Sequence, residues 1–144
     1  MIFHSKMKII IDTREQSPWH FGDLAEVSRG TLPTGDYALA GDTGFAIERK
    51  SLADYVQTIT SGWRRFRREL ERMRGWPVRV VIVEGEWMDI LTGSYPGNVP
   101  PPAVIARTAE LVMDNVSIMF CSNPTAAAGL CWRLLLERKK RLES

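Results

Sequence analysis

The feature that most restricts the fold is a run of β-branched residues, Val-Val-Ile-Val, at positions 80–83. Valine and isoleucine are favoured in strands, and a run without polar alternation is typical of a strand buried on both faces. Residues 77–85 are therefore predicted to form an interior strand that ends at Glu84. The Lys-Ile-Ile-Ile segment at residues 8–11 has the same character and predicts a second buried strand.

Helical patterns alternate with strand patterns along the rest of the chain. The capping-box sequence Ser-Leu-Ala-Asp predicts that a helix begins at Ser51 and continues to about Ile59. After a break near Ser61, apolar residues at three- and four-residue steps predict a second helix; the stripe consists of Trp63, Phe66, Leu70 and Met73. Further on we expect a helix, a strand and a helix at residues 103–113, 116–121 and 124–141. Residues 17–34 and 91–102 are expected to be irregular, with Trp19 and Phe21 as core residues.

Length and composition narrow the class of protein. At 144 residues the chain has the length of one domain, and its hydrophobic content of 44% is ordinary for a globular protein without a membrane span. The net charge is only +2, so attraction to nucleic acid must come from where the charges lie. Cys121 and Cys131 have no metal-ligand spacing and are expected to be free. Residues 1–6 lack a signal peptide, which predicts an intracellular protein, cytoplasmic in a prokaryote or virus and nuclear in a eukaryote.

The chemistry is concentrated in a predicted hairpin at residues 36–50. Because side chains alternate along a strand, Glu48 and Lys50 project from one face. The Gly-Asp-Thr-Gly turn at residues 41–44 returns the chain and brings Asp36 towards them. A loop of those four residues would set Asp36 opposite Arg49, whereas a loop one residue longer would set it opposite Glu48. We favour the longer loop, or a bulge.

Two neighbouring carboxylates repel each other unless a cation lies between them, and oxygen ligands suit Mg²⁺ or Mn²⁺. With Lys50 to orient water or stabilise an oxyanion, Asp36 and Glu48 would form a site for metal-assisted phosphodiester hydrolysis. The alternative is an exposed hairpin with an incidental cluster of charges.

Other acidic residues near this hairpin have two readings each. Asp12, at the end of the first strand, and Glu15 are candidate ligands or supports for the ligands, and the alternative for Asp12 is a turn that it caps. Asp54 is better explained by helix capping than by metal binding. Glu84 either supports a ligand or is an ordinary residue at a strand end.

Six arginines lie on the predicted helix at residues 63–74, against only two glutamates. A solvated helix face normally mixes the two signs more evenly. We therefore expect a DNA-binding track on this helix, represented by Arg64, Arg67 and Arg68. Arg14 and Arg49, beside the acidic residues, are also expected to contact DNA.

These residues resemble the nuclease domain of the XPF-type structure-specific endonucleases. The family pattern, Gly-Asp followed by Glu-Arg-Lys-x-x-x-Asp, matches Gly35-Asp36 and residues 48–54, and the Asp-x-Arg-Glu element matches residues 12–15. The resemblance covers about the first half of the chain. It implies a restriction-endonuclease-like α/β fold, a central mixed sheet with the catalytic hairpin on one side and helices on both faces. It also implies a metal-dependent DNA endonuclease that acts on branched or flap-like structures.

The resemblance also raises questions about partners and domains. Family members commonly carry a tandem helix-hairpin-helix module and some carry a helicase; this chain has room for neither, so residues 1–144 are expected to form a single nuclease domain. The last predicted helix has a wide apolar surface, which fits either a well-buried helix or the interface of a homodimer or heterodimer such as the family uses. Two rival functions are a catalytically silent DNA-binding or scaffolding domain that pairs with an active nuclease, and an RNA-acting nuclease.

Overall fold

The β-branched run becomes β5 (Arg79–Glu84), an interior strand whose four middle residues are buried, as predicted. The computed structural model describes residues 6–76 and 78–144. Pro77, His4 and the start of the chain, on which the expectation about a signal peptide depends, lie outside the described residues. The helices within residues 6–76 and 78–144 include none that is long and apolar enough to cross a membrane.

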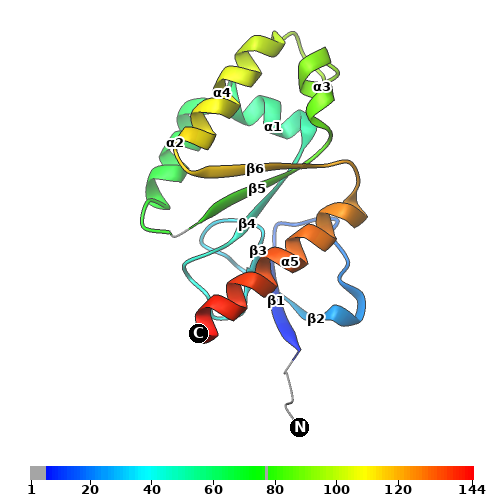
Figure 1. The fold of residues 1–144 in the computed structure, drawn as a ribbon, viewed down its shortest axis with the longest axis vertical. Coiled ribbons are helices and arrows are strands. Elements are labelled where there is room, and N and C mark those ends of the chain that lie inside the picture. The colour runs from blue at the N-terminus through cyan, green and yellow to red at the C-terminus, as the bar shows by residue number, and fades with distance from the viewer. Residues whose placement is uncertain (1–5, 77) are drawn as a thin grey trace.

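Six strands form one mixed sheet in the order β2-β1-β3-β4-β5-β6 (Figure 1). Besides β5 they are β1 (Met7–Asp12), β2 (Ala25–Gly30), β3 (Tyr37–Leu39), β4 (Ile47–Ser51) and β6 (Val116–Cys121). The middle strand β3 is antiparallel to β1 and β4, and the other three pairs are parallel. The mixed sheet is confirmed, but the hairpin was expected on one side of the sheet and instead supplies its two central strands.

Helices cover both faces of the sheet, as predicted. They are α1 (Leu52–Ile59), α2 (Trp63–Arg72), α3 (Trp87–Thr92), α4 (Pro101–Met113) and α5 (Pro124–Glu143), with a 3-10 turn, η1 (Gly22–Leu24). Helices α1, α2 and α4 pack on one face, whereas α5 packs on the other (Figure 1). The predicted start of α1 is confirmed. Ser51 caps this helix, and its hydroxyl accepts a hydrogen bond from the Asp54 amide at 3.1 Å.

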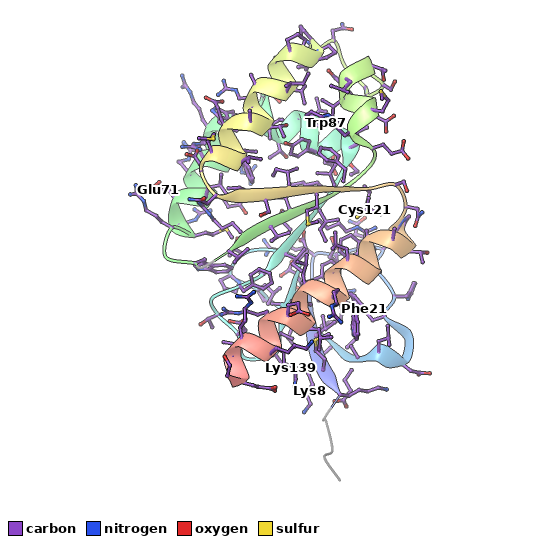
Figure 2. All side chains as sticks on the ribbon, in the orientation of Figure 1. Lys8, Phe21, Glu71, Trp87, Cys121 and Lys139 are labelled. Carbon is purple, nitrogen blue, oxygen red and sulfur yellow. The ribbon has the colours of Figure 1, made fainter. Side chains whose placement is uncertain are left out.

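Two elements were missed in segments expected to be irregular or left unassigned. Strand β2 lies at the edge of the sheet, and only Ala25 of its six residues is buried, so it lacks the apolar pattern of the inner strands. Helix α3 packs through Trp87 on Phe120 of β6, with the ring centroids 5.5 Å apart. Figure 2 labels Trp87 on this helix. Neither arrangement can be read from local periodicity.

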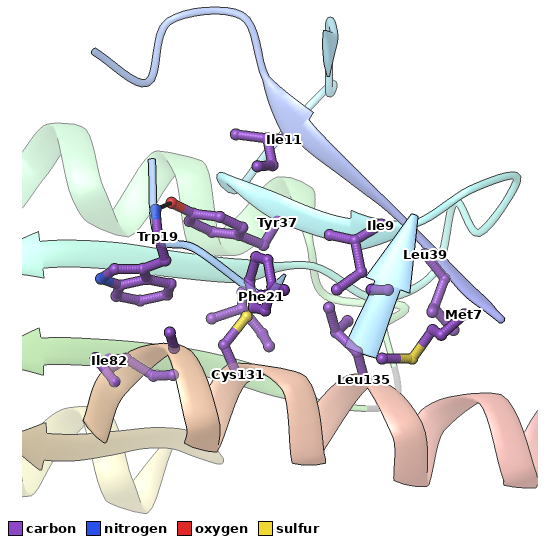
Figure 3. Packing of buried hydrophobic residues seen from close by; sticks show 14 of the residues in the cluster. Met7, Ile9, Ile11, Trp19, Phe21, Tyr37, Leu39, Ile82, Cys131 and Leu135 are labelled. Atoms are coloured by element: carbon purple, nitrogen blue, oxygen red, sulfur yellow. Dashed lines mark hydrogen bonds between the residues drawn. The ribbon is translucent and has the colours of Figure 1, made fainter. Parts of the chain in front are cut away.

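The core has one cluster on each side of the sheet. On the α5 side, Trp19 stacks on Tyr37 with ring centroids 4.7 Å apart, and Phe21 meets Tyr37 edge-on, above Cys131 of α5 (Figure 3). Trp19 and Phe21 are thus core residues, as predicted. Cys131 is buried, and both it and Cys121 are free thiols. On the other side, Phe66 and Leu70 of α2 pack on Val81 and Val83 of β5.

Candidate active site

The backbone of Asp36 is bonded to both neighbouring strands. Its N–H donates to the Ile47 carbonyl at 2.8 Å, and its carbonyl accepts from the Asp12 N–H at 2.9 Å. The preceding Gly35 has φ of +79°, and a Cβ there would lie 2.6 Å from Cβ of Ala46. Only glycine therefore allows this close approach of the chain, which places Asp36 in the centre of the sheet.

The register of the hairpin is the one with the longer loop. Tyr37 lies opposite Ile47, as the longer loop requires, and the Asp36 N–H donates to the carbonyl of the same Ile47, so the regular pairing does not continue to Asp36. The ladder stops there because the Arg49 N–H donates to the Asp36 carboxylate, at 2.7 Å, instead of to a backbone carbonyl. The favoured prediction of the register is confirmed, and one carboxylate oxygen of Asp36 is oriented by the backbone of β4.

Glu48 and Lys50 share the face of β4 that looks towards α1 and α2, as strand alternation predicts. Lys50 Nζ lies 3.4 Å from Glu48 Oε1, and the two side chains are 23% and 22% exposed. The predicted group of an ammonium and two carboxylates is therefore present in the structure.

The two central carboxyl groups are held in an environment that disfavours their charge. Burial raises the pKa of Asp36 to about 6, against the opposing effect of the Arg49 N–H. Burial, followed by the nearby charge of Asp36, raises the pKa of Glu48 to about 7. Lys50 lowers both pKa values only in part. A cation between the two carboxylates would relieve this repulsion.

Asp12 is placed differently from the prediction that it is a metal ligand. Its side chain is 1% exposed and accepts hydrogen bonds from the Leu32 N–H at 2.9 Å and from the backbone N–H and guanidinium of Arg14, the shortest at 2.7 Å. The Arg14 hydrogen bond lowers the pKa of Asp12 to about 2. Asp12 therefore fixes the loop and orients Arg14, whose own side chain is 71% exposed at the rim of the site.

Glu15 and Arg49 belong to a buried polar cluster, which we call the Arg49 cluster. Glu15 Oε2 accepts from the Tyr37 hydroxyl at 2.8 Å and from Arg49 Nη1 at 3.1 Å. Arg49 Nε donates to Glu84 Oε1 at 2.6 Å, and its guanidinium lies 4.7 Å from the centre of the Trp19 ring. Glu15 Oε2 thus accepts from two groups of the protein, and a direct metal bond from Glu15 stays a prediction. Arg49, 17% exposed, is likewise a structural residue and not the DNA contact predicted for it.

The prediction from the sequence placed more than two carboxylates around one metal ion. Within residues 6–76 and 78–144, no three His, Cys, Asp or Glu residues are grouped so that they could hold a metal ion. Of the four ligands expected from the sequence, Asp36 and Glu48 lie beside Lys50, whereas Asp12 and Glu15 are hydrogen-bonded to Arg14 and Arg49. Glu84 pairs with Arg49. The Asp54 backbone N–H donates to the Ser51 hydroxyl at the start of α1, while the Asp54 side chain lines the larger cleft, so the choice between capping and metal binding for its carboxylate stays a prediction.

The helix α2 presents a different set of arginines to the site from the one predicted. Arg65, Glu69 and Arg72, spaced by four and three residues, line the clefts around Glu48. Arg64 and Arg68 are exposed and line neither cleft. The sequence did contain a signal for these residues. The apolar stripe at Phe66 and Leu70 determines which side of the helix faces the sheet, and the residues one position before each stripe residue then lie beside the sheet. The sequence did not indicate on which side of α2 the hairpin lies.

Arg67, the third predicted DNA-binding residue of this helix, has partners within the protein. Its guanidinium forms an ion pair with Asp114 and lies 5.5 Å from the centre of the Trp63 ring. Arg107 of α4 lies 4.4 Å from the same ring. Arg67 therefore joins α2 to the end of α4.

Two clefts meet at the acidic pair. The smaller has a volume of about 310 Å³ and contains Asp12, Arg14 and Asp36; the larger, of about 670 Å³, contains Lys50 and extends between α1 and α2. Glu48, Arg65 and Glu69 line both clefts and so form their common boundary. Carboxylates, an ammonium and guanidiniums around one boundary can bind a phosphodiester and polarise water beside it.

This arrangement, an acidic pair and a lysine on the central hairpin of a mixed sheet flanked by helices, defines a domain of the restriction-endonuclease-like class. The ERCC4 domain model matches residues 11–131. The chain belongs to the ERCC4 domain family.

Solved structures support the same fold. XPF from Aeropyrum pernix is 23% identical, with a TM-score of 0.72 over 91% of this chain and 61% of that one. The same protein in complex with DNA is also 23% identical, with a TM-score of 0.69 over 94% of this chain and 66% of that one. The chain thus spans less than two thirds of the length of these structures. Comparison with curated protein sequences yields no match.

Proposed function

We propose that this chain is a metal-dependent DNA endonuclease that hydrolyses phosphodiester bonds in branched or flap-like DNA. The observation that carries the proposal is the pair of partly buried carboxyl groups, Asp36 and Glu48, with raised pKa values beside Lys50 at the junction of two clefts. Strongly perturbed titratable groups in a cleft are typical of functional sites. Membership of the ERCC4 domain family and the likeness to an XPF structure that holds DNA support nucleic acid as the substrate.

The residues fit a small hard cation such as Mg²⁺ or Mn²⁺. Mg²⁺ is usually held by one or two carboxylates and completes its shell with water and substrate phosphate oxygens, so Asp36 and Glu48 suffice. When bound, the ion would neutralise charge on the phosphate and lower the pKa of a bound water. Asp12 and Glu15 then act from outside the shell, by fixing the chain around Asp36.

Each basic residue at the junction has a separate part in the proposal. Lys50 Nζ, 3.4 Å from Glu48, positions the attacking water or stabilises charge that develops on the phosphate oxygens. Arg14, exposed at the rim, and Arg65 and Arg72 along α2 contact phosphates on either side of the cleaved bond. Arg49 holds the hairpin in shape below them.

The test is a substrate panel with the purified protein. Labelled flap, fork, linear duplex and single-stranded RNA substrates are incubated with Mg²⁺, with Mn²⁺ or with excess chelator. We expect cleavage of branched DNA with either ion, none in chelator, and recovery when the ion is restored. Cleavage of RNA in preference to DNA would favour the RNA-acting alternative. DNA binding without cleavage under all these conditions would favour the silent scaffolding domain.

A further inference from the structure

The larger of the two clefts is bigger than the chemistry at Glu48 requires. It runs from the acidic pair along the groove between α1 and α2, and its volume of about 670 Å³ lies in the range of sites that hold a small organic molecule, about 300–1,000 Å³. We call it the α1–α2 cleft. Its position beside Glu48 and Lys50 means that whatever it holds lies next to the reacting phosphate.

The charges in the α1–α2 cleft are not those of a phosphate site. The cations of its lining are Lys50, which lies beside Glu48, and Arg65, at the boundary shared with the smaller cleft. The lining also carries the carboxylates of Glu48, Asp54 and Glu69, the amide of Gln57 and two hydroxyls; the hydroxyls belong to Thr58 and Ser61. This mixture of donors and acceptors suits a neutral partner that has both.

A nucleobase has such an edge. Carboxylates accept hydrogen bonds from the amino groups of bases, the glutamine amide both donates and accepts, and hydroxyls can do either, so together they can bind the Watson–Crick edge of a base. Phe66 adds an apolar wall next to these polar groups. In a duplex the Watson–Crick edge of a base is covered by its partner, so the cleft can bind this edge only when the nucleotide is unpaired.

We propose that the α1–α2 cleft binds one unpaired nucleotide next to the phosphate that is cleaved. The strand then crosses Glu48 with its phosphate between Lys50 and Arg65 and its neighbouring base among Asp54, Gln57 and Ser61. This inference rests on the proposed function and deepens it, because it makes local unpairing at the cleaved bond a condition for efficient cleavage. A branched structure would satisfy that condition without any contact to the branch itself.

The first test measures binding without metal, so that it is independent of cleavage. Fluorescence anisotropy compares a mixed-sequence single strand, the same strand with abasic sites, and the corresponding duplex. The double variant Gln57→Leu/Ser61→Ala removes hydrogen-bonding groups from the cleft without adding bulk that would fill it. A matched double variant, Ser122→Ala/Thr125→Val, changes exposed residues just before and at the start of α5, on the other face of the sheet.

We expect the cleft variant to bind the single strand about tenfold more weakly, the lower part of the range for losing one bound base, while duplex affinity is unchanged. Abasic sites should weaken binding by the parent to a similar extent and have little further effect on the cleft variant. The α5 variant should behave as the parent. Equal reductions in affinity for single strand and duplex, or no reduction for either, would overturn the proposal.

The second test measures cleavage on forks that differ only in whether the nucleotides beside the cleaved bond are paired or mismatched. The parent should prefer the mismatched substrate at least about tenfold in kcat/KM, and the cleft variant should lose that preference. If the parent cleaves both substrates equally, the α1–α2 cleft does not select unpaired DNA although the chain is a nuclease. If the parent cleaves neither, the proposed nuclease function fails, and the binding measurement still decides the cleft.

Discussion

Two residues of the motif that are adjacent in sequence have opposite surroundings in the fold. Glu48 looks towards α1 and α2 at the boundary of the clefts, whereas Arg49 looks towards the other face and is held by Glu15 and Glu84. Strand alternation separates them completely. The backbone N–H of Arg49 still reaches the site, because it donates to Asp36. Along β4, residues that line the cleft therefore alternate with a residue that holds the hairpin in place.

Lys50→Ala and Asp36→Ala should separate chemistry from binding. Lys50→Ala removes a positioned cation and leaves both carboxylates, so DNA should still bind while cleavage falls by about two or more orders of magnitude. Asp36→Ala should lower both metal affinity and cleavage, with metal-free DNA binding unchanged or tighter because an anion near the phosphates is removed. Single-turnover cleavage, anisotropy and circular dichroism are measured for each. Parental turnover in both folded variants would refute the assignment.

Glu48→Gln tests the raised pKa values through stability. A carboxyl group whose pKa rises from 4.5 to about 7 on folding contributes stability below pH 4.5 that is lost as the pH rises through 7. Without metal, the variant should therefore be more stable than the parent at pH 8, by about 1–3 kcal/mol, and the difference should shrink towards pH 5. Denaturant titrations at several pH values provide the measurement.

The same Glu48→Gln comparison reports on the cation without any assay of cleavage. An ion that binds only the folded state stabilises it by mass action. Mg²⁺ or Mn²⁺ should therefore raise the melting temperature of the parent clearly and that of the variant little. Equal shifts in both proteins would argue against Asp36 and Glu48 as the ligands.

Arg49→Lys tests the structural role given to Arg49. Lysine keeps the charge but cannot donate at once to Glu84, Glu15 and the Ser17 carbonyl, so the variant should lose about 2–4 kcal/mol of unfolding free energy. Cleavage should fall with it, because the side-chain contacts that hold the hairpin in shape are lost. DNA affinity and its salt dependence should stay at parental values, unlike those of a residue that binds a phosphate. The control is Arg133→Lys, at an exposed position of α5.

At the scale of elements, α2 shows how one helix divides its surface among three neighbours. Phe66 and Leu70 are buried against the sheet, Arg65 and Arg72 line the clefts, and Arg67 pairs with Asp114 next to α4. The helix begins at Trp63 after a turn closed by the Gly62 N–H on the Gln57 carbonyl, at 2.9 Å. This short turn sets α2 directly after α1, so both helices line the larger cleft.

Two matched double variants should identify the face of α2 that binds DNA. Arg65→Ala/Arg72→Ala should weaken binding and lower the log-log salt slope by about one unit for each phosphate that the protein no longer neutralises. Arg64→Ala/Arg68→Ala removes the same charge from residues that line neither cleft and should have a clearly smaller effect. Both leave the apolar stripe intact, so thermal stability should hardly change. The reverse order of effects would restore the track expected from the sequence.

At the scale of the whole molecule, α5 covers the sheet on the side away from the clefts and contacts the hairpin of β3 and β4. Ala127, Cys131 and Leu135 are buried against the sheet, which uses a large part of the apolar surface of this helix within the chain. Near the C-terminus, Arg138 forms two hydrogen bonds, of 2.8 and 3.0 Å, with Asp42 in the hairpin loop. A dimer through the C-terminal helices stays a prediction, which the molar mass in solution would test.

Arg138→Ala should show how far α5 holds the hairpin in place. The Asp42 side chain is only 5% exposed, and loss of its partner leaves a buried carboxylate with the Gly44 N–H. We expect a loss of about 2–4 kcal/mol in unfolding free energy, with Lys139→Ala, on the same helix, as a near-neutral control. Because Arg138 lowers the pKa of Asp42, the difference between variant and parent should diminish at acidic pH. Equal stabilities of variant and parent at pH 7 would show that the ion pair is not needed.

The sequence by itself determined the features that depend on near neighbours in the chain. The caps of α1 and α5, the apolar stripe of α2, the bounds of β6 and the shared face of Glu48 and Lys50 follow from local periodicity and side-chain hydrogen bonding. Each of these is decided within a few residues. The same holds for the Gly-Asp and Glu-Arg-Lys pattern, from which the family resemblance was recognised.

Only the tertiary structure decided which chemically suitable residues meet. Arg49 donates to Glu84, which is 35 positions away in the sequence, and Asp12 accepts from Leu32, which is 20 positions away. These contacts place Arg49 and Asp12 differently from the DNA contact and the metal ligand that their residue types suggested. The hairpin became the centre of the sheet because β1 and β5 pair with its two outer edges. Which arginines of α2 line the clefts depends on which side of the helix faces this hairpin. Strand order and helix docking depend on packing between segments that are distant in the sequence, so local sequence patterns do not predict them.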